Sequence, residues 1–199
     1  MKNLLLMRHG KSSWELNVSD EDRALLQSGV SDAKLVGEAL SQNGLQPDFS
    51  FSSPANRALH TAMICLRQLR FPLGNFKVIP ELYDFSGNYV LKFIKSLPNN
   101  LNTVLIFGHN HAFTHIANSL GSKHIENVPT SGFVHLQFNE QSWASISKET
   151  TFSDNHLTLT TIHTSQILVS TSTPKKKTSH TNLTTHHITH PTPQPTQTL

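Results

Sequence analysis

Short apolar runs that stop at a small or turn-forming residue recur along the first 110 residues. A run of about four to eight apolar or β-branched residues bounded in this way is typical of a buried strand in a parallel sheet. Two such runs cover residues 4–7 and 103–107, and a run in which apolar and small residues alternate covers residues 49–52. A shorter one covers residues 77–79. The pattern therefore predicts several buried strands near the start and middle of the chain.

Between these runs, apolar residues recur at intervals of three and four, which is the spacing of an amphipathic helix. Such faces cover residues 30–40, 59–69, 90–97 and 112–120. Ser53 as N-cap and Pro54 in the first turn are expected to open the second of these helices. Residues 133–138 and 143–146 are predicted to form a closing hairpin. Strands that alternate with helices in this order predict an α/β fold with a doubly wound sheet.

An arginine or a histidine follows each of the three main predicted strands within a few residues. Arg8 and His9 follow the first, Arg57 falls in the first turn of the helix after the second, and His109 follows the third. Ligands of open α/β sheets bind at the carboxyl ends of the strands. A guanidinium matches phosphate oxygens, an imidazole can attack phosphorus, and Gly10 is expected to let the backbone approach an anion closely. Each residue alone is explained by a surface turn, but together they predict a phosphate site.

Five segments extend this pattern in a fixed order. They are Leu6-Met7-Arg8-His9-Gly10-Lys11-Ser12-Ser13-Trp14, Ser52-Ser53-Pro54-Ala55-Asn56-Arg57-Ala58, Pro80-Glu81-Leu82-Tyr83, Gly108-His109-Asn110 and Ile125-Glu126-Asn127-Val128-Pro129-Thr130-Ser131-Gly132. In these segments the chain resembles the histidine phosphatase superfamily, also called phosphoglycerate mutase-like, and most closely its small SixA-type phosphohistidine phosphatases. The resemblance covers about three quarters of the chain and implies a three-layer α/β/α fold with a mostly parallel central sheet.

The resemblance also implies roles for the residues at the strand ends. His9 corresponds to the phosphorylated nucleophile, Arg8 and Arg57 to the phosphate clamp, and His109 to the second histidine of the pocket. Phosphoryl transfer depends on positioning and positive charge, which these side chains supply without a metal or other cofactor. His9 must attack in its neutral form, and the neighbouring arginines disfavour the imidazolium.

Two further residues are candidates for the site. Glu81 corresponds to the position at which many members of the superfamily carry a general acid, although a solvated loop carboxylate explains it equally well. Ser12 is a candidate hydrogen-bond donor to the bound phosphate. Lys11, Ser13 and Trp14 match the SixA-type pattern and are expected at the pocket rim, where an exposed loop is the alternative.

Chain length favours a protein substrate. The recognisable domain covers residues 1–150 and has no room for long insertions over the site, so an open pocket is expected. Such a pocket favours phosphohistidine displayed on a partner protein. The alternatives are a phosphomonoesterase of small molecules, and a non-catalytic module that binds phosphate without turnover. A mutase would need an enclosed site that excludes water.

Histidine spacing raises a hypothesis of another class, a metal-binding protein. The candidate ligands are His109, His111 and His115 in the domain and His186, His187 and His190 near the C-terminus. No cysteine or carboxylate accompanies either group in the sequence. Sensitivity to a chelator would separate this reading from a histidine phosphatase.

The remaining features concern location and partners. Residues 1–150 carry 13 basic and 12 acidic residues, so the domain is nearly neutral and predicts no nucleic-acid partner. The lone Cys65, the absence of a signal-peptide core and the absence of a membrane-length apolar run predict a cytoplasmic protein without a membrane partner. Oligomeric state is left open. Residues 151–172 are expected to form an extra strand, with Leu157, Leu159 and Ile162, or an irregular extension. The Thr, His and Pro-rich residues 173–199 are expected to be disordered.

Overall fold

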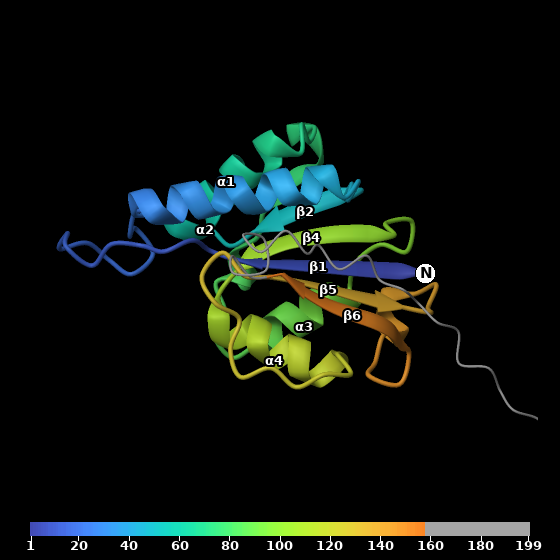
Figure 1. The fold of residues 1–199 in the computed structure, drawn as a ribbon. Helices are drawn as coiled ribbons and strands as arrows, with labels where there is room; N and C mark the ends of the chain where they lie inside the picture. The colour runs from blue at the N-terminus through green and yellow to red at the C-terminus, as the bar shows by residue number, and fades with distance from the viewer. Residues whose placement is uncertain (158–199) are drawn as a thin grey trace, which may run out of the picture. The chain divides into compact units, whose positions relative to one another are not determined.

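The computed structural model describes residues 1–157, whose strands form one mixed sheet (Figure 1). The strands are β1 (Lys2–Arg8), β2 (Phe49–Ser52), β3 (Phe76–Val78), β4 (Thr103–Gly108), β5 (Phe133–Phe138) and β6 (Thr151–Leu157). Their order in the sheet is β3-β2-β4-β1-β5-β6. The strands β1 to β4 are mutually parallel, β5 runs antiparallel to its neighbour β1, and the edge strand β6 runs antiparallel to β5. The prediction of a mostly parallel sheet is confirmed.

Helices cover both faces of this sheet. The helices α1 (Gln27–Gln42) and α2 (Asn56–Gln68) pack on one face, and α3 (Asn88–Lys95) and α4 (Asn110–Leu120) pack on the other (Figure 1). Three short 3-10 helices, η1 (Leu73–Asn75), η2 (Pro80–Leu82) and η3 (Trp143–Ser145), lie in the connections of the described part. The three-layer α/β/α architecture expected from the resemblance is therefore present.

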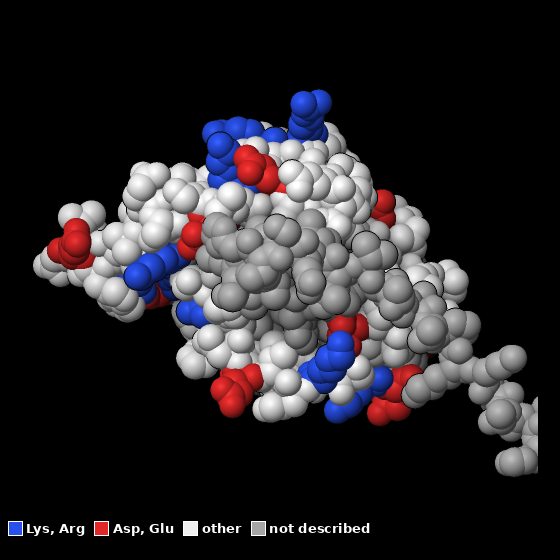
Figure 2. Space-filling view, in the orientation of Figure 1, with Lys and Arg blue, Asp and Glu red and all other residues white. Residues whose placement is uncertain are grey.

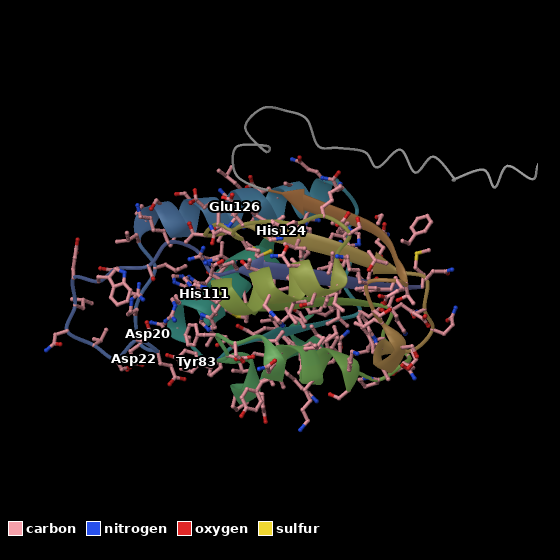
Figure 3. All side chains as sticks on the ribbon, turned by 90° about the horizontal axis from the view of Figure 1, so that it is seen from below. Asp20, Asp22, Tyr83, His111, His124 and Glu126 are labelled. Atoms are coloured by element: carbon pink, nitrogen blue, oxygen red, sulfur yellow. The ribbon has the colours of Figure 1, made fainter. Side chains whose placement is uncertain are left out.

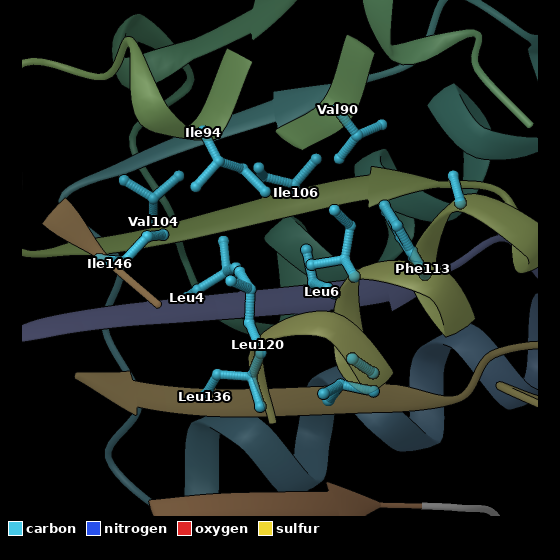
Figure 4. Close-up of a cluster of buried hydrophobic side chains, with 14 of the residues drawn as sticks. Leu4, Leu6, Val90, Ile94, Val104, Ile106, Phe113, Leu120, Leu136 and Ile146 are labelled. Carbon is cyan, nitrogen blue, oxygen red and sulfur yellow. The ribbon is translucent and has the colours of Figure 1, made fainter. Parts of the chain in front are cut away.

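The middle of β1 is apolar at successive positions because both of its faces are buried. Leu4 and Leu6 of β1 belong to the cluster that packs against α3 and α4 (Figure 4). Leu5 and Met7 of the same strand belong to the cluster that packs against α1 and α2. Successive side chains of a strand point to opposite faces, so a strand between two helical layers needs apolar residues at every position.

The expected start of α2 is wrong by two residues, because the N-cap is Ala55 and not Ser53. The helix begins at Asn56 and Ala55 occupies the N-cap position, without a capping hydrogen bond from its side chain. Ser53 instead accepts a hydrogen bond from the backbone N–H of Ala55 and contacts His109 through its hydroxyl. The serine at this junction therefore belongs to the edge of the sheet where the strands end.

The closing hairpin is formed by different residues from those predicted. Residues 143–145 form η3, and the strand paired with β5 is β6. Trp143 and Ile146 are buried in the cluster beneath α3 and α4, and the indole N–H of Trp143 donates to the carbonyl of Leu101 at 2.8 Å. These two apolar residues are therefore anchors of a turn and not members of a strand.

The extra strand expected within residues 151–172 is partly described. Leu157 is the last residue of β6, whereas Leu159, Ile162 and the expected disordered segment 173–199 lie outside the described residues. Within residues 1–157, no helix combines the length and the apolar character that crossing a membrane requires.

Candidate active site

Parallel pairing of β1 with β4 places two histidines side by side. The register pairs Arg8 with Gly108, so His9 and His109 each stand one residue beyond the paired strand ends. The backbone N–H of His9 donates to the carbonyl of Gly108 at 3.0 Å, and the centroids of the two imidazole rings are 5.4 Å apart. The structure thus brings together two residues that are 100 positions apart in the sequence.

Helix α2 adds Arg57 to this pair. The buried guanidinium of Arg57 places its Nε 3.4 Å from Nε2 of His9 and its Nη2 3.5 Å from Nδ1 of His109. One turn later, the hydroxyl of Thr61 donates to the carbonyl of Arg57 at 2.7 Å and accepts the backbone N–H of Gly10 at 2.9 Å. This hydroxyl ties the first turns of α2 to the backbone that follows β1, and so holds Arg57 against His9.

The hydrogen bond of His9 determines its tautomer. Nδ1 lies 2.8 Å from the carbonyl oxygen of Gly10. A carbonyl only accepts, so Nδ1 carries the proton and the neutral ring has its lone pair on Nε2. Nε2 is the nitrogen that faces the guanidinium of Arg57. The ring therefore presents an unprotonated nitrogen towards the cationic part of the site.

Burial and positive charge keep both histidines neutral. Burial lowers the pKa of His9 to about 4, the hydrogen bond to Gly10 opposes this, and the charges of nearby arginines, Arg57 foremost, add to it. Burial, followed by the charge of Arg57, lowers the pKa of His109 to about 3. Both rings are uncharged at neutral pH, which is the form in which an imidazole nitrogen can act as a nucleophile.

His109 is held between Arg57 and Ser53. An arginine only donates, so Nδ1 of His109 accepts from Arg57, and Nε2 carries the proton and donates to the hydroxyl of Ser53 at 2.9 Å. The aromatic rings of Tyr83 and Phe85 pack against the imidazole with centroid distances of 5.3 and 4.8 Å. Hydrogen bonds at both nitrogens and packing against two aromatic side chains therefore fix the orientation of the His109 ring.

His9, Arg57 and His109 line a cavity of about 480 Å³ whose charge is mainly positive. Its charged lining side chains are Arg8, Lys11, Arg23, Arg57 and Asp20. Nη1 of Arg8 donates to the carbonyl of Val128 at 2.6 Å, and no carboxylate within residues 1–157 forms a salt bridge with Arg8. A cavity in which cations outnumber carboxylates is suited to a multiply charged anion such as a phosphoryl group.

The carboxylate of Asp20 organises two of the arginines. Its oxygens lie 2.7 Å from Nη2 of Arg57, 2.9 Å from Nη1 of Arg23 and 2.7 Å from the hydroxyl of Tyr83, which donates to it. Figure 3 shows Asp20 and Tyr83 beside each other, near His111. Burial acts to raise the pKa of Asp20, but hydrogen bonds from Tyr83, Arg23 and Arg57 hold it well below its ordinary value. This carboxylate is therefore ionised in the folded protein at neutral pH.

The structure separates the two less certain candidates. Ser12 is buried, lines the cavity and accepts a hydrogen bond from Nη2 of Arg23 at 2.6 Å, so its own hydroxyl proton remains available to donate. Glu81 is exposed in η2 and is not among the side chains that line the cavity. Two residues further on, Tyr83 reaches the site through its bond to Asp20.

Sequence reasoning missed Asp20, Arg23 and Tyr83 as parts of the site. The only signal for the first two was a run of four charged residues, 20–23, which is equally typical of a solvated loop. Tyr83 stands in a segment that carried the resemblance, but the carboxylate beside it attracted the catalytic hypothesis. Contacts between these three residues arise only when the loop after β1 folds back over α2.

Gly10 has a different role from the one expected. A Cβ at this position would lie 2.7 Å from the carbonyl oxygen of Gly29 in α1, and the backbone N–H of Gly10 is already bound to Thr61. Glycine is therefore required by the close packing of two backbone segments, and its N–H is not free for an anion.

The metal-binding hypothesis finds no ligand set in the described part of the chain. No three side chains among the His, Cys, Asp and Glu of residues 1–157 are grouped to hold a metal ion. His111 lines the cavity near His109, whereas His115 contacts Ser119 at 3.4 Å. His186, His187 and His190 lie outside the described residues.

Comparison with known proteins gives this site a family. The model of the histidine phosphatase superfamily (branch 1) matches residues 4–86. An uncharacterised chloroplast protein of Arabidopsis thaliana is 30% identical over 154 residues, which are 71% of this chain and 69% of that protein. A phosphoglycerate mutase of Schizosaccharomyces pombe is 40% identical over 72 residues, 35% of this chain and 34% of the mutase. The chain thus matches about a third of the length of that mutase.

Solved structures share the fold at lower identity. An Agrobacterium tumefaciens protein described as phosphohistidine phosphatase SixA superposes with a TM-score of 0.61 and 24% identity, over 69% of this chain and 92% of that one. The protein histidine phosphatase SixA in complex with tungstate gives a TM-score of 0.60 and 18% identity, over 78% and 94% of the two chains. The sequence matches and the common fold lead to one assignment: this chain belongs to the histidine phosphatase superfamily.

Proposed function

We propose that this protein is a SixA-type phosphatase that uses His9 as its nucleophile and removes the phosphoryl group from phosphohistidine on a partner protein. The observation that carries the proposal is the unprotonated Nε2 of His9, which faces Arg57 in a cationic cavity. A neutral imidazole nitrogen beside a site for a phosphoryl group is the arrangement that covalent phosphoryl transfer requires.

Binding is assigned to the charged lining of the cavity. Arg8 and Arg57 hold the oxygens of the phosphoryl group, and the hydroxyl of Ser12 donates one further hydrogen bond. His109 lies beside His9 and helps to position Arg57 through its Nδ1. Because the transition state spreads charge over the equatorial oxygens, fixed guanidinium groups stabilise it more than they would in water.

The reaction proceeds in two displacements. Nε2 of His9 forms a bond to phosphorus while the bond from phosphorus to the leaving group breaks, and the leaving group takes the electron pair. Water then forms a bond to phosphorus, the bond to Nε2 breaks, and inorganic phosphate is released. Nδ1 keeps its proton, which it donates to the carbonyl of Gly10 throughout, so His9 leaves the second step in the state in which it began.

The absence of a protonated acid in the cavity favours phosphohistidine over an alkyl phosphate. Among the described residues that line the cavity, Asp20 is the one carboxyl group, and its lowered pKa keeps it ionised. An imidazole whose second nitrogen carries a proton departs as a neutral molecule and needs no acid. An alkoxide does need one. We therefore assign no acid role to Glu81, whose exposed position lies outside the cavity lining.

A small-molecule phosphatase is the second candidate function. An aryl oxide also leaves without strong acid catalysis, and the mouth of the cavity carries the aromatic side chains of Trp14 and Phe85. Such a leaving group would be accepted by the same chemistry, so the choice between the two substrates requires direct comparison.

The test compares release of phosphate from a phosphohistidine protein and from an aryl phosphate, both with EDTA present. We expect turnover by the wild type to survive the chelator and to fall at least about a thousandfold in His9→Ala, the scale of losing a covalent nucleophile. His60→Ala, which alters an exposed histidine of α2, is the matched control and should retain full activity. With a labelled phosphoryl group on the substrate, the phosphoenzyme trapped by quenching in base should carry label in the wild type and in His60→Ala, and none in His9→Ala.

The outcomes separate the readings. Higher kcat/KM for the phosphohistidine protein supports the proposed substrate, and higher kcat/KM for the aryl phosphate favours the second candidate. Full activity in His9→Ala would show that the nucleophile is another residue. A folded wild type that binds phosphate but releases none from either substrate would identify a binding module. Loss of activity on chelation would restore the metal hypothesis.

A further inference from the structure

Large apolar side chains stand exposed in the loop that joins β1 to α1. We call residues 9–26 the β1–α1 loop. Trp14, Leu16 and Val18 in this loop are 76%, 64% and 46% exposed, and they alternate with polar residues. Single exposed apolar residues are ordinary, but three within five positions concentrate apolar surface on one loop, and concentrated exposed apolar surface marks an interaction site.

Hydrogen bonds fix the base of the loop, so the exposed apolar side chains project from a backbone that is held in place. The N–H of Ser13 donates to the carbonyl of Ala24 at 2.9 Å, next to an antiparallel bridge between Ser12 and Leu25. The N–H of Asn56 in α2 donates to the carbonyl of Glu21 at 2.8 Å. Asp20 adds its contacts with Arg57 and Tyr83. The two ends of the exposed segment are therefore fixed to the walls of the cavity.

The apolar surface is continuous with the candidate active site. Trp14 lines the cavity, and its ring lies over the guanidinium of Arg23, 3.1 Å from the carbon at its centre. Phe85, from the segment before α3, lines the same cavity and is 45% exposed. From Trp14 the surface runs outward along the loop to Leu16 and Val18, which do not line the cavity.

The charge of the loop indicates what kind of molecule can approach. The cavity itself is cationic, but Glu15, Glu21 and Asp22 are exposed on the same loop. Figure 2 shows acidic side chains on the part of this loop that projects from the sheet edge. Carboxylates outside a cationic pocket repel a metabolite with several negative groups, and they favour an apolar or basic protein segment that carries one phosphoryl group.

We propose that the β1–α1 loop is the docking surface for the partner protein, and that apolar side chains beside its phosphohistidine pack on Leu16 and Val18. This inference rests on the proposed function, because it concerns the protein that delivers the phosphoryl group. A small phosphorylated molecule is accommodated by the cavity alone. A protein must also place the backbone around its phosphohistidine against the rim, and the loop provides the apolar contact area that this requires.

The experiment uses two double variants of the full chain. Leu16→Ala with Val18→Ala removes the proposed contact without touching the cavity lining. Leu73→Ala with Val78→Ala is the matched control, because these residues are 60% and 42% exposed and lie far along the sequence from the loop. Each is assayed on a phosphohistidine-bearing phosphotransfer domain and on the free amino-acid derivative N-acetyl phosphohistidine.

We expect the loop variant to lose roughly tenfold in kcat/KM on the protein substrate, through KM, since two partly buried aliphatic side chains are lost from the contact. Turnover of N-acetyl phosphohistidine should stay at the wild-type level, and the control variant should match the wild type on both substrates. An unchanged KM for the protein substrate, or equal losses on both substrates, would overturn the docking assignment. If the wild type hydrolyses only the aryl phosphate, the proposed function fails, and this inference fails with it.

Discussion

At the scale of single residues, the carboxylate of Asp20 decides where the guanidinium of Arg57 points. Asp20 binds Arg57 through its side chain at 2.7 Å and through its backbone carbonyl, and it binds Arg23 as well. With both Nη atoms occupied in this way, Arg57 is left with its Nε directed at His9. Asp20 is a positioning residue in this arrangement, and its charge also offsets part of the positive field of the cavity.

Substitution of Asp20 should therefore separate binding from turnover. We expect Asp20→Asn to lower kcat roughly tenfold, because Arg57 loses its fixed orientation, while inorganic phosphate inhibits more strongly in the more cationic cavity. Tyr83→Phe is the matched variant: it removes one hydrogen bond to the same carboxylate and leaves the charge, so both effects should be smaller. Steady-state kinetics with phosphate as inhibitor measure the two quantities. Weaker inhibition by phosphate in Asp20→Asn would contradict this role.

The lowered pKa of His9 makes a second prediction at this scale. A free histidine is half protonated near pH 6.5, whereas burial lowers the pKa of His9 to about 4. If His9 is the nucleophile, kcat/KM for an aryl phosphate should stay level down to about pH 5 and reach half its value near pH 4. Circular dichroism at each pH checks that the fold is intact. An acidic limb centred at pH 6.5 would show that a different, solvated group controls the rate.

At the scale of secondary-structure elements, two glycines set the distance between α1 and the residues after β1. A Cβ on Gly29 would lie 2.3 Å from the carbonyl oxygen and 2.7 Å from the nitrogen of Lys11, and both are backbone atoms that cannot rotate away. Gly10 meets Gly29 from the other side. This backbone contact holds the start of α1 against the segment that carries His9.

Gly29→Ala should accordingly destabilise the protein by about 2–3 kcal/mol, as expected for forced overpacking of a backbone contact. Gly74→Ala is the control, because a Cβ there meets nothing within 4 Å and the position requires no positive φ. Its effect should stay within about 0.5 kcal/mol. Urea denaturation measures both. Equal stability of the two variants would mean that α1 shifts at little cost.

The closing strand shows where local pattern fails at the element scale. The apolar residues around Trp143 and Ile146 give the sequence pattern of a buried strand. In the structure these residues are buried, but they anchor a turn beneath α3. The strand β6 is largely polar because it lies at the sheet edge, and Asp154 within it accepts hydrogen bonds from the N–H groups of Ser122 and Lys123. Such long-range partners leave no local signal.

At the scale of the whole molecule, folding buries histidines in their neutral form. Burial is the largest cause that lowers the pKa of His9 and His135 to about 4 and that of His109 to about 3. In the unfolded chain each titrates near pH 6.5. Between these values the unfolded chain binds more protons than the folded one, so stability is greatest above pH 6.5 and falls as the pH decreases towards 4.

We expect the free energy of unfolding to decrease by at least about 2 kcal/mol between pH 6.5 and 4.5, because each such histidine contributes up to about 1.4 kcal/mol per pH unit. Urea titrations across this range measure it. His135 lies outside the candidate site. His135→Gln should reduce the slope of the free energy of unfolding against pH by the contribution of one proton. A free energy of unfolding that is constant across this range would show that these histidines do not resist protonation in the folded state.

The sequence by itself determined the strand cores, the helices between them and the chemistry at the strand ends. Buried parallel strands and amphipathic helices are local patterns, and Arg8, His9, Arg57 and His109 stand at junctions that any parallel sheet brings to one edge. Only the tertiary structure decided which nitrogen of His9 carries the proton, that Tyr83 binds Asp20 at the site, and that Asp20 holds Arg57. Those facts depend on contacts between segments tens of residues apart, which form when the β1–α1 loop closes over α2, and no periodicity along the chain records them.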